Sequence, residues 1–454
     1  MALEKGELMK RKKAVENQKE DVKKVKKTNK LDASEDGIKY IPYCDNDIAK
    51  VTSSNGALSR KFQTYDLIAN FKKDLHIRGY VDYYGGYAEH TRQIIYRLDK
   101  TNKWNVKLTN IKTPVDVDVF TWQRNNQFIH NTVDEDCDFL CIGGPGWMQK
   151  KFLPENRKTY GWTMIESKRF SEECAEWIKN PDVLICPTDT DIIRAKKAGV
   201  ENPVKVHLGY DELKYNPVVQ QMEFGNIGDN YVFGVLGSWN TRKSIKEIIH
   251  AYCRAFDKDD KVSLLMVCKY GTRPYGERKH DKDIWNIKYE FDKIIKELDT
   301  DKKDLPHITL IDIPIHDNVL PHIMARFNCL VGFSKGESTW LPGLQAMGMK
   351  IPVIQLASEC SGFMEYMNED NSFLCRNVKY KTATPDLYKG TSEYYEGQLF
   401  AHGDVEELSE KMKLVHSMKN ITAIYDMIDR AYEEVSRHWT WNNSIRRLEQ
   451  VLNL

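Results

Sequence analysis

The 454-residue chain lacks the features that place proteins in membranes or in the extracellular space. No run approaches the ~18 consecutive apolar residues of a membrane-spanning helix, and the N-terminal sequence MALEKGELMKRKK has no apolar core of a signal peptide. The 10 cysteines form no CxxC pair and have no spacing typical of zinc ligands. We therefore expect a cytoplasmic protein with reduced thiols and without a membrane span.

The chain also lacks an excess of charge of either sign, because 67 Lys and Arg residues are balanced by 66 Asp and Glu residues. A net charge of +1 argues against adhesion of the whole protein to nucleic acid or to a membrane, and leaves room only for local patches. The lysine-rich segment 1–36 is such a patch and contains no aromatic residue. We expect a solvated tail or a frayed helix there. The alternatives are a basic arm that holds an anionic acceptor such as DNA, and a coiled coil with a partner.

The rest of the sequence alternates apolar, strand-like runs with amphipathic, helix-like stretches, which is typical of parallel sheets with crossover helices. The alternation stops at a polar stretch, 216–230, and then starts again. A chain of this length usually forms two domains. We therefore predict an α/β protein with two doubly wound, Rossmann-like domains. The expected strands are residues 76–84, 115–122, 137–144, 181–188 and 203–210 in the first domain, and 231–238, 262–269, 307–313, 327–333 and 351–355 in the second.

Two polar segments follow predicted strands of the second domain. Arg242 and Lys243 come after the strand-like run YVFGVLGS and just before a helix, where two cations beside free backbone N–H groups favour a diphosphate. Glu337 comes after the run FNCLVGF, at the start of another helix, where a carboxylate can accept hydrogen bonds from sugar hydroxyls. Ligands of doubly wound sheets bind beyond the carboxyl ends of the strands. The two segments together predict a site for a sugar nucleotide, although cations before a helix are often merely solvated.

The segment GESTWLPGLQAMGMKIPVI, residues 336–354, resembles the signature of the retaining glycosyltransferases of family 4, which have the GT-B fold. Further segments are similar to this family in the same order: GGYAEHTRQIIYRL, WTMIESKRFSEECAEWI, PVKVHLGYDELKYNP, GSWNTRKSIKEIIHAY and, at the end of the chain, HWTWNNSIRRLEQVL. The resemblance covers roughly residues 75 to 454. The lysine-rich tail, 1–36, lies outside it. For the rest of the chain we expect an N-terminal acceptor domain, 37–217, a nucleotide-sugar domain, 218–435, and a closing helix, 436–454, that returns to the first domain.

The resemblance also implies roles for individual residues. Arg242 and Lys243 would stabilise the leaving diphosphate, and Glu337 would contact hydroxyls of the donor sugar. The enzyme would be a metal-independent hexosyl- or pentosyltransferase without a cofactor, whose donor substrate is a nucleoside-diphosphate sugar. Further donor contacts would come from Gly85, Gly86, Ser338, Thr339, Trp340, Leu341 and Gln345, and acceptor or cleft contacts from His90 and Glu166.

The sequence departs from the family pattern at two of these positions. Gln345 stands where a second acid is usual, which replaces a charged clasp on the ribose by an amide, and Trp340 stands where glycine is common. Two of these residues also have a purely structural explanation. His90 could be a packed or exposed histidine, and Glu166 could form a structural hydrogen bond. The Asp-x-Asp segments mimic metal motifs, but residues 116–118 are more simply explained as part of an alternating strand, and 189–191 as a capped helix start.

Three other functions remain open from the sequence. A relative of the same fold could epimerise or hydrolyse the nucleotide sugar, and Gln345 with Trp340 would also suit a binding protein that has lost catalysis. Within the transferases, the lysine-rich segment 1–36 leaves room for modified DNA bases as acceptor. The acceptor is otherwise a glycan, a protein or a small molecule, and the sequence of loop 269–283 does not reveal the base or the sugar.

Overall fold

The computed structural model describes residues 72–111, 117–269, 287–298, 304–313, 315–384, 395 and 397–453. The chain divides into two units, Met1–Lys72 and Lys73–Leu454, and the fold described below is that of the second unit. The predicted tail at 1–36 and nearly all of loop 269–283 lie outside the described residues.

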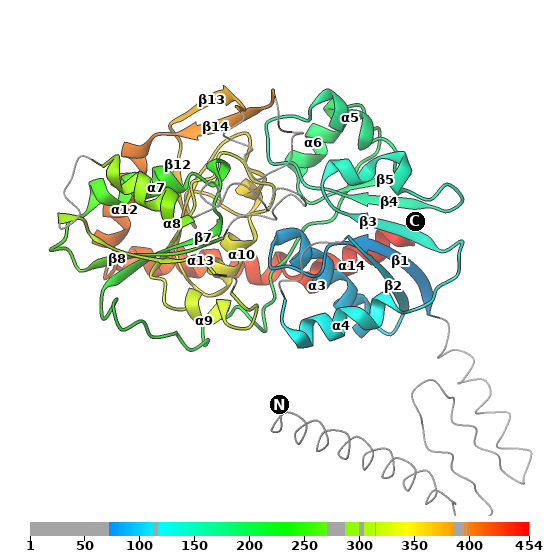
Figure 1. Ribbon diagram of the computed structural model, residues 1–454, viewed down its shortest axis with the longest axis horizontal. Coiled ribbons are helices and arrows are strands. Elements are labelled where there is room, and N and C mark those ends of the chain that lie inside the picture. The colour runs from blue at the N-terminus through cyan, green and yellow to red at the C-terminus, as the bar shows by residue number, and fades with distance from the viewer. Residues whose placement is uncertain are drawn as a thin grey trace, which may run out of the picture. The chain divides into compact units, whose positions relative to one another are not determined.

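The first part of the unit, which we call the first lobe, contains a parallel sheet of six strands in the order β2-β1-β3-β4-β5-β6 (Figure 1). Leu75 on strand β1, which is second from the edge of the sheet, is buried and pairs with Val106 on one side and Asp138 on the other. The strands are β1 (Lys73–Gly79), β2 (Trp104–Asn110), β3 (Asp138–Ile142), β4 (Thr159–Trp162), β5 (Val183–Cys186) and β6 (Val204–Lys205), and the helices are α3 (Gly86–Lys100), α4 (Val119–Ile129), α5 (Glu172–Trp177) and α6 (Asp189–Lys197).

The second lobe repeats this architecture with a parallel sheet in the order β12-β11-β10-β7-β8-β9, so the predicted pair of doubly wound, Rossmann-like sheets is confirmed. Its strands are almost continuously apolar because helices cover both faces. They are β7 (Tyr231–Ser238), β8 (Val262–Lys269), β9 (His307–Ile311), β10 (Cys329–Val331), β11 (Val353–Leu356) and β12 (Phe373–Cys375), with helices α7 (Ile245–Ala255), α8 (Ile287–Lys296), α9 (Leu320–Met324), α10 (Leu341–Gly348) and α12 (Val405–Ser417), and an antiparallel pair β13 (Val378–Thr382) and β14 (Leu399–Gly403).

Two consecutive helices at the end of the chain connect the lobes (Figure 1). Helix α13 (Thr422–His438) packs against α10 of the second lobe, and α14 (Trp441–Leu452) packs against α3 of the first. The turn between them is fastened to the first lobe, because the Tyr210 N–H donates to the Trp439 carbonyl at 2.9 Å. Trp439 and Trp441, on either side of this turn, are both buried in the core.

One predicted strand is wrong. The alternating sequence at 115–122 favoured a strand, but the described part of it begins a helix, because the Asp118 side chain accepts hydrogen bonds from the Phe120 and Thr121 N–H groups and so caps α4. Strand β2 was not expected, although its buried residues Trp104, Val106 and Leu108 have the alternation of a half-buried strand. At the start of α4, the helix cap formed by Asp118 therefore outweighs the strand-like alternation.

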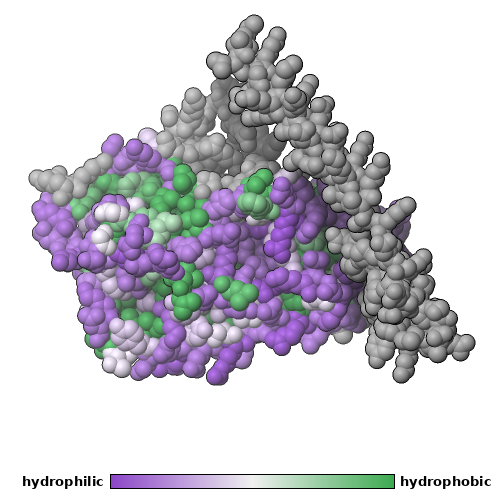
Figure 2. Space-filling view, turned by 90° about the horizontal axis from the view of Figure 1, so that it is seen from below, coloured by the Kyte–Doolittle hydropathy of each residue, from purple (hydrophilic) through white to green (hydrophobic). Residues whose placement is uncertain are grey.

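Within the described residues, no helix is long and apolar enough to cross a lipid bilayer. The cysteines among them are free thiols. Burial raises the pKa of Cys141 to about 12 and that of Cys174 to about 11, so these thiols are protonated at neutral pH. The face of the molecule in Figure 2 is mainly hydrophilic, with apolar side chains in separate patches.

Candidate active site

Three loops that follow parallel strands bring charged side chains together. The loop after β7 contains a short 3-10 turn, Thr241–Lys243, with Arg242 and Lys243. The loop after β10 carries Glu337, and the loop after β4, from the first lobe, carries Glu166. All three loops start at the carboxyl ends of their strands, where doubly wound proteins bind ligands.

These four residues form a cluster that we call the charged quartet: Glu166, Arg242, Lys243 and Glu337. Arg242 Nη1 lies 3.1 Å from Glu337 Oε1, and Arg242 Nη2 lies 3.0 Å from Glu166 Oε1. Lys243 Nζ also contacts Glu337 Oε1. The structure therefore brings the three predicted catalytic residues into direct contact and adds Glu166 from the other lobe.

The backbone holds the two cations in place. The Asn240 side chain accepts a hydrogen bond from the Lys243 N–H at 3.0 Å and so caps the turn. The Arg242 carbonyl accepts from the Lys335 N–H at 2.8 Å, and Arg242 Nη1 donates to the Gly336 carbonyl at 2.7 Å. Arg242 is thus tied to the Glu337 loop by its backbone and by its side chain.

Lys335 is a residue of the site that sequence reasoning missed. Its side chain is only 2% exposed, and Nζ donates to the Ser244 hydroxyl at 2.9 Å and to Glu247 Oε1 at 2.6 Å. It thereby fastens the Glu337 loop to the start of α7. The sequence feature that could have indicated its role is its position two residues before Glu337, just after an apolar strand.

Burial and neighbouring charges act in opposite directions on Glu337. Burial alone would raise its pKa, but Lys243 and Arg242 outweigh burial and hold the pKa of Glu337 below its ordinary value. Burial would likewise lower the pKa of Arg242, but Glu166 and Glu337 raise it instead. Glu337 and Arg242 are therefore both charged at neutral pH.

A small pocket, partly open to solvent, lies beside Glu166. Met164 and Phe170 of the first lobe contribute apolar walls. Tyr395 and Gln398 of the second lobe contribute polar groups, and the Tyr395 hydroxyl donates to Glu166 Oε2. The pocket is therefore built by both lobes and adjoins the charged quartet.

The predicted donor segment after Glu337 is almost entirely buried. The Ser338 hydroxyl donates to Asp191 of the first lobe, and the Tyr366 hydroxyl donates to the Thr339 carbonyl at 2.7 Å. The side chains of Leu341 and Gln345, on α10, are 9% and 8% exposed. Their donor contacts stay predictions, and the observed contacts fix the loop that carries Glu337.

Trp340 occupies the left-handed backbone region, with φ 54°, immediately before α10. Its ring packs against the backbones of Gly332 and Gly343, where an added Cβ would lie 2.5 Å and 2.3 Å from ring atoms. The residue is 5% exposed, and its ring centroid lies 6.0 Å from that of Phe363. The ring belongs to the core beneath the loop, and its contact with a sugar remains a prediction.

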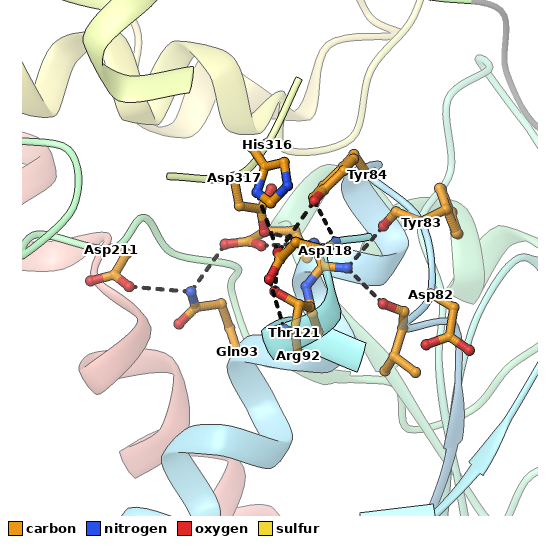
Figure 3. A network of polar contacts seen from close by, with 12 residues as sticks. Asp82, Tyr83, Tyr84, Arg92, Gln93, Asp118, Thr121, Asp211, His316 and Asp317 are labelled. Atoms are coloured by element: carbon orange, nitrogen blue, oxygen red, sulfur yellow. Dashed lines mark hydrogen bonds and ion pairs between the residues drawn. The ribbon is translucent and has the colours of Figure 1, made fainter. Parts of the chain in front are cut away.

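The predicted glycine loop lies at the start of α3. Gly85 is the N-cap residue, and a Cβ there would lie 2.2 Å from the Tyr83 ring, whereas a Cβ at Gly86 would meet nothing within 4 Å. Arg92, which sequence reasoning missed, donates to the Val81 and Tyr83 carbonyls at 2.8 Å each (Figure 3). A buried guanidinium therefore sets the course of this loop.

Figure 3 shows how the same region meets the second lobe. Arg92 Nη2 lies 3.1 Å from Asp317 Oδ2 and 3.2 Å from Glu89 Oε2, and His316 Nδ1 lies 3.4 Å from Asp118 Oδ2. Burial and the neighbouring Glu89 raise the pKa of Asp317 in spite of Arg92. The lobes thus also meet at this second ionic cluster, which, unlike the charged quartet, does not line the pocket.

His90 is fully buried on α3. Its ring centroid lies 4.3 Å from that of Trp162 and 5.8 Å from that of Trp441, and neither ring nitrogen has a hydrogen-bond partner among the described residues. Burial lowers its pKa to about 3, so the ring is neutral. The structure places His90 in the core between α3 and α14, and its predicted acceptor contact remains untested.

The Asp-x-Asp segment at 189–191 is a capped helix start, as predicted. The Thr188 side chain accepts from the Asp191 N–H, and Asp191 pairs with Arg194 at 3.0 Å. Burial raises the pKa of Asp191 to about 6. Within the described part of the chain, no group of three or more His, Cys, Asp and Glu side chains could hold a metal ion.

No protein-family model and no curated protein matches the sequence. Solved structures are similar in fold. Sucrose-phosphate synthase from Thermosynechococcus elongatus has a TM-score of 0.59 at 13% identity, over 84% of this chain and 98% of that chain. A glycosyltransferase from Rickettsia africae has a TM-score of 0.59 at 10% identity, over 85% and 98%. The α,α-trehalose 6-phosphate synthase from Burkholderia multivorans has a TM-score of 0.57 at 10% identity, over 84% and 98%.

The fold is GT-B. The two parallel six-stranded sheets match those of the similar structures, so the fold expected from the sequence resemblance is confirmed. Identities of 10–13% carry the comparison no further than the fold. The activity has to be argued from the charged quartet and the pocket beside it.

Proposed function

We propose that the protein is a retaining glycosyltransferase of the family 4 type, which moves a sugar from a nucleoside-diphosphate sugar to an acceptor hydroxyl without a metal ion. The observation that carries the proposal is the charged quartet, in which Arg242 and Lys243 converge on Glu337 beside a pocket made by both lobes. The similar structures include a glycosyltransferase and two synthases of sugar phosphates, which supports this class.

The charges account for the reaction. When the anomeric bond breaks, negative charge develops on the leaving diphosphate and positive charge on the sugar. Arg242 and Lys243 supply fixed cations for the diphosphate in a site where water is scarce, which is where such cations lower a barrier most. Glu337 accepts hydrogen bonds from the sugar hydroxyls and remains ionised because the cations lower its pKa. In this mechanism the two cations take the part that a metal ion plays in other transferases.

Retention follows if the acceptor attacks from the face that the diphosphate leaves, so no protein nucleophile is assigned. The acceptor hydroxyl would enter through the pocket lined by Glu166 and Tyr395. Contact between the lobes would exclude water and limit hydrolysis of the donor. The free, protonated thiols fit the expected cytoplasmic location.

The test starts from a screen of UDP-, GDP- and ADP-sugars by thermal shift with the purified protein. Mass spectrometry of reactions with glycan, peptide, small-molecule and modified-DNA acceptors then identifies the product. A transferase consumes the donor slowly without acceptor and rapidly with it, whereas a hydrolase or epimerase consumes it rapidly alone. The proposal is abandoned if no nucleotide sugar raises the melting temperature and no acceptor gains mass.

A further inference from the structure

The charged quartet has no net charge. Arg242 and Lys243 contribute two positive charges, and Glu166 and Glu337 contribute two negative charges. A diphosphate carries at least two negative charges and needs cations that are not already neutralised. The quartet provides such a surplus only when one of its carboxylates leaves.

The two carboxylates are held very differently. The side chain of Glu337 is 6% exposed and contacts both cations. Its backbone is fixed on both sides, because the Glu337 N–H donates to the Cys360 carbonyl at 3.0 Å and its carbonyl accepts from the Gly362 N–H at 3.0 Å. The site therefore holds Glu337 in place.

Glu166 is the carboxylate that can leave. Its side chain is 23% exposed and contacts only Arg242 among the cations of the quartet. It comes from the first lobe and also lines the pocket, where the Tyr395 hydroxyl contacts its second oxygen. Movement of this side chain breaks one ion pair and leaves Arg242 Nη1 on Glu337.

We propose that Glu166 is an internal competitor of the donor's diphosphate: its carboxylate holds the Nη2 edge of Arg242 and gives this edge up when the diphosphate binds. The inference rests on the proposed function. Donor binding is then an exchange of one anion for another at Nη2, while Nη1 stays on Glu337, so neither edge of the buried guanidinium loses its partner. The displaced carboxylate remains in the pocket, where it can accept a hydrogen bond from the acceptor hydroxyl, and this makes the donor bind before the acceptor.

The experiment is isothermal titration calorimetry of the full-length protein with inorganic pyrophosphate, which probes the anion site without reference to the base or sugar. Glu166→Gln keeps the shape of the side chain and removes its charge, so we expect pyrophosphate to bind about tenfold more tightly than to the wild type. Equal or weaker binding overturns the inference.

A matched control is Glu359→Gln. Glu359 also forms an ion pair between the lobes, at 2.9 Å from Lys168, but its side chain has no contact with Arg242. The substitution removes the same charge, and we expect pyrophosphate affinity to stay within about twofold of the wild type. An equal gain in both variants would mean a general charge effect and would also overturn the inference.

Stability separates competition from a structural role. If Glu166 were only a strut between the lobes, Glu166→Gln would lower the melting temperature and weaken pyrophosphate binding together. If that variant does not fold, Glu166→Asp, which keeps the charge and shortens the reach to Arg242, is expected to show a smaller gain in affinity, and no gain overturns the inference. Failure of the wild type and the variants to bind pyrophosphate, UDP, GDP or ADP would instead refute the proposed function as well.

Discussion

Two of the ionic contacts between the lobes are built alike. In each, a buried arginine lies between a carboxylate of the first lobe and one of the second: Arg242 between Glu166 and Glu337, and Arg92 between Glu89 and Asp317. They differ in their surroundings. Arg92 also donates to two backbone carbonyls, whereas Arg242 donates to one and adjoins the pocket. A second cation is present at both contacts, since Lys214 Nζ lies 3.9 Å from Asp317 Oδ2. Ion pairing therefore does not by itself mark a candidate active site, and the adjoining pocket is what distinguishes the quartet.

The largest effect is expected from Arg92→Met. The substitution leaves Glu89 and Asp317 without their buried partner and frees the Val81 and Tyr83 carbonyls, so the free energy of unfolding should fall by about 3–5 kcal/mol in urea denaturation. The control is Arg254→Met, whose exposed pair with Glu406 should change stability by less than about 1 kcal/mol. If Arg92→Met were as stable as the wild type but had lost turnover, Arg92 would have a functional role and the contrast with the charged quartet would be wrong.

The opposite outcome is expected at the charged quartet. Lys243→Ala removes a cation that would stabilise the leaving diphosphate, so turnover of the donor identified in the screen should fall by about 10²–10³-fold. The melting temperature should change little, because the backbone of the turn is held by Asn240. Steady-state kinetics and thermal unfolding measure the two quantities, and a large loss of stability with unchanged turnover per folded molecule would contradict the assignment.

Asp191 extends the comparison to a contact where one carboxylate is paired with an arginine of its own helix. Burial raises its pKa from 3.8 to about 6, so the folded protein binds a proton that the unfolded chain has released. This group therefore contributes most to stability below pH 4, and its contribution declines as the pH rises to about 6. Asp191→Asn removes this titration, so between pH 4 and pH 6 the free energy of unfolding of the variant should fall by about 3 kcal/mol less than that of the wild type. Urea denaturation at a series of pH values measures this difference, and parallel curves of unfolding free energy against pH for the wild type and the variant would refute the assigned role of Asp191.

The smallest effect concerns the approach of the lobes at the quartet. A Cβ at Gly336 would lie 1.7 Å from the Glu166 carbonyl oxygen, a backbone atom that cannot rotate away. Gly336→Ala should therefore push the two loops apart and lower turnover about tenfold, with little change at Arg92. In the control, Gly225→Ala, the new methyl group meets nothing within 4 Å. Unchanged kinetics of Gly336→Ala would show that contact between these loops is not required.

Sequence reasoning was most successful where the relevant contacts are local. The small turn, the Leu-Pro pair and the following apolar strand around Glu337 predict a strand end followed by a helix, and β10, α10 and β11 have this arrangement. The same reasoning missed Arg92 and Lys335, because a single arginine or lysine in a polar segment has no local pattern that shows burial. It also took the start of α4 for a strand, because alternation was weighed without the cap formed by Asp118.

The sequence by itself determined the two doubly wound sheets and the strand ends where charged loops gather, because the pattern of apolar and polar residues along the chain indicates strands and helices. The tertiary structure alone decided which of those charges meet. Arg92 and Asp317 are 225 residues apart, and Glu166 and Tyr395 are 229 residues apart. Contacts across such separations depend on how the two lobes pack, and local propensity contains no information on that packing.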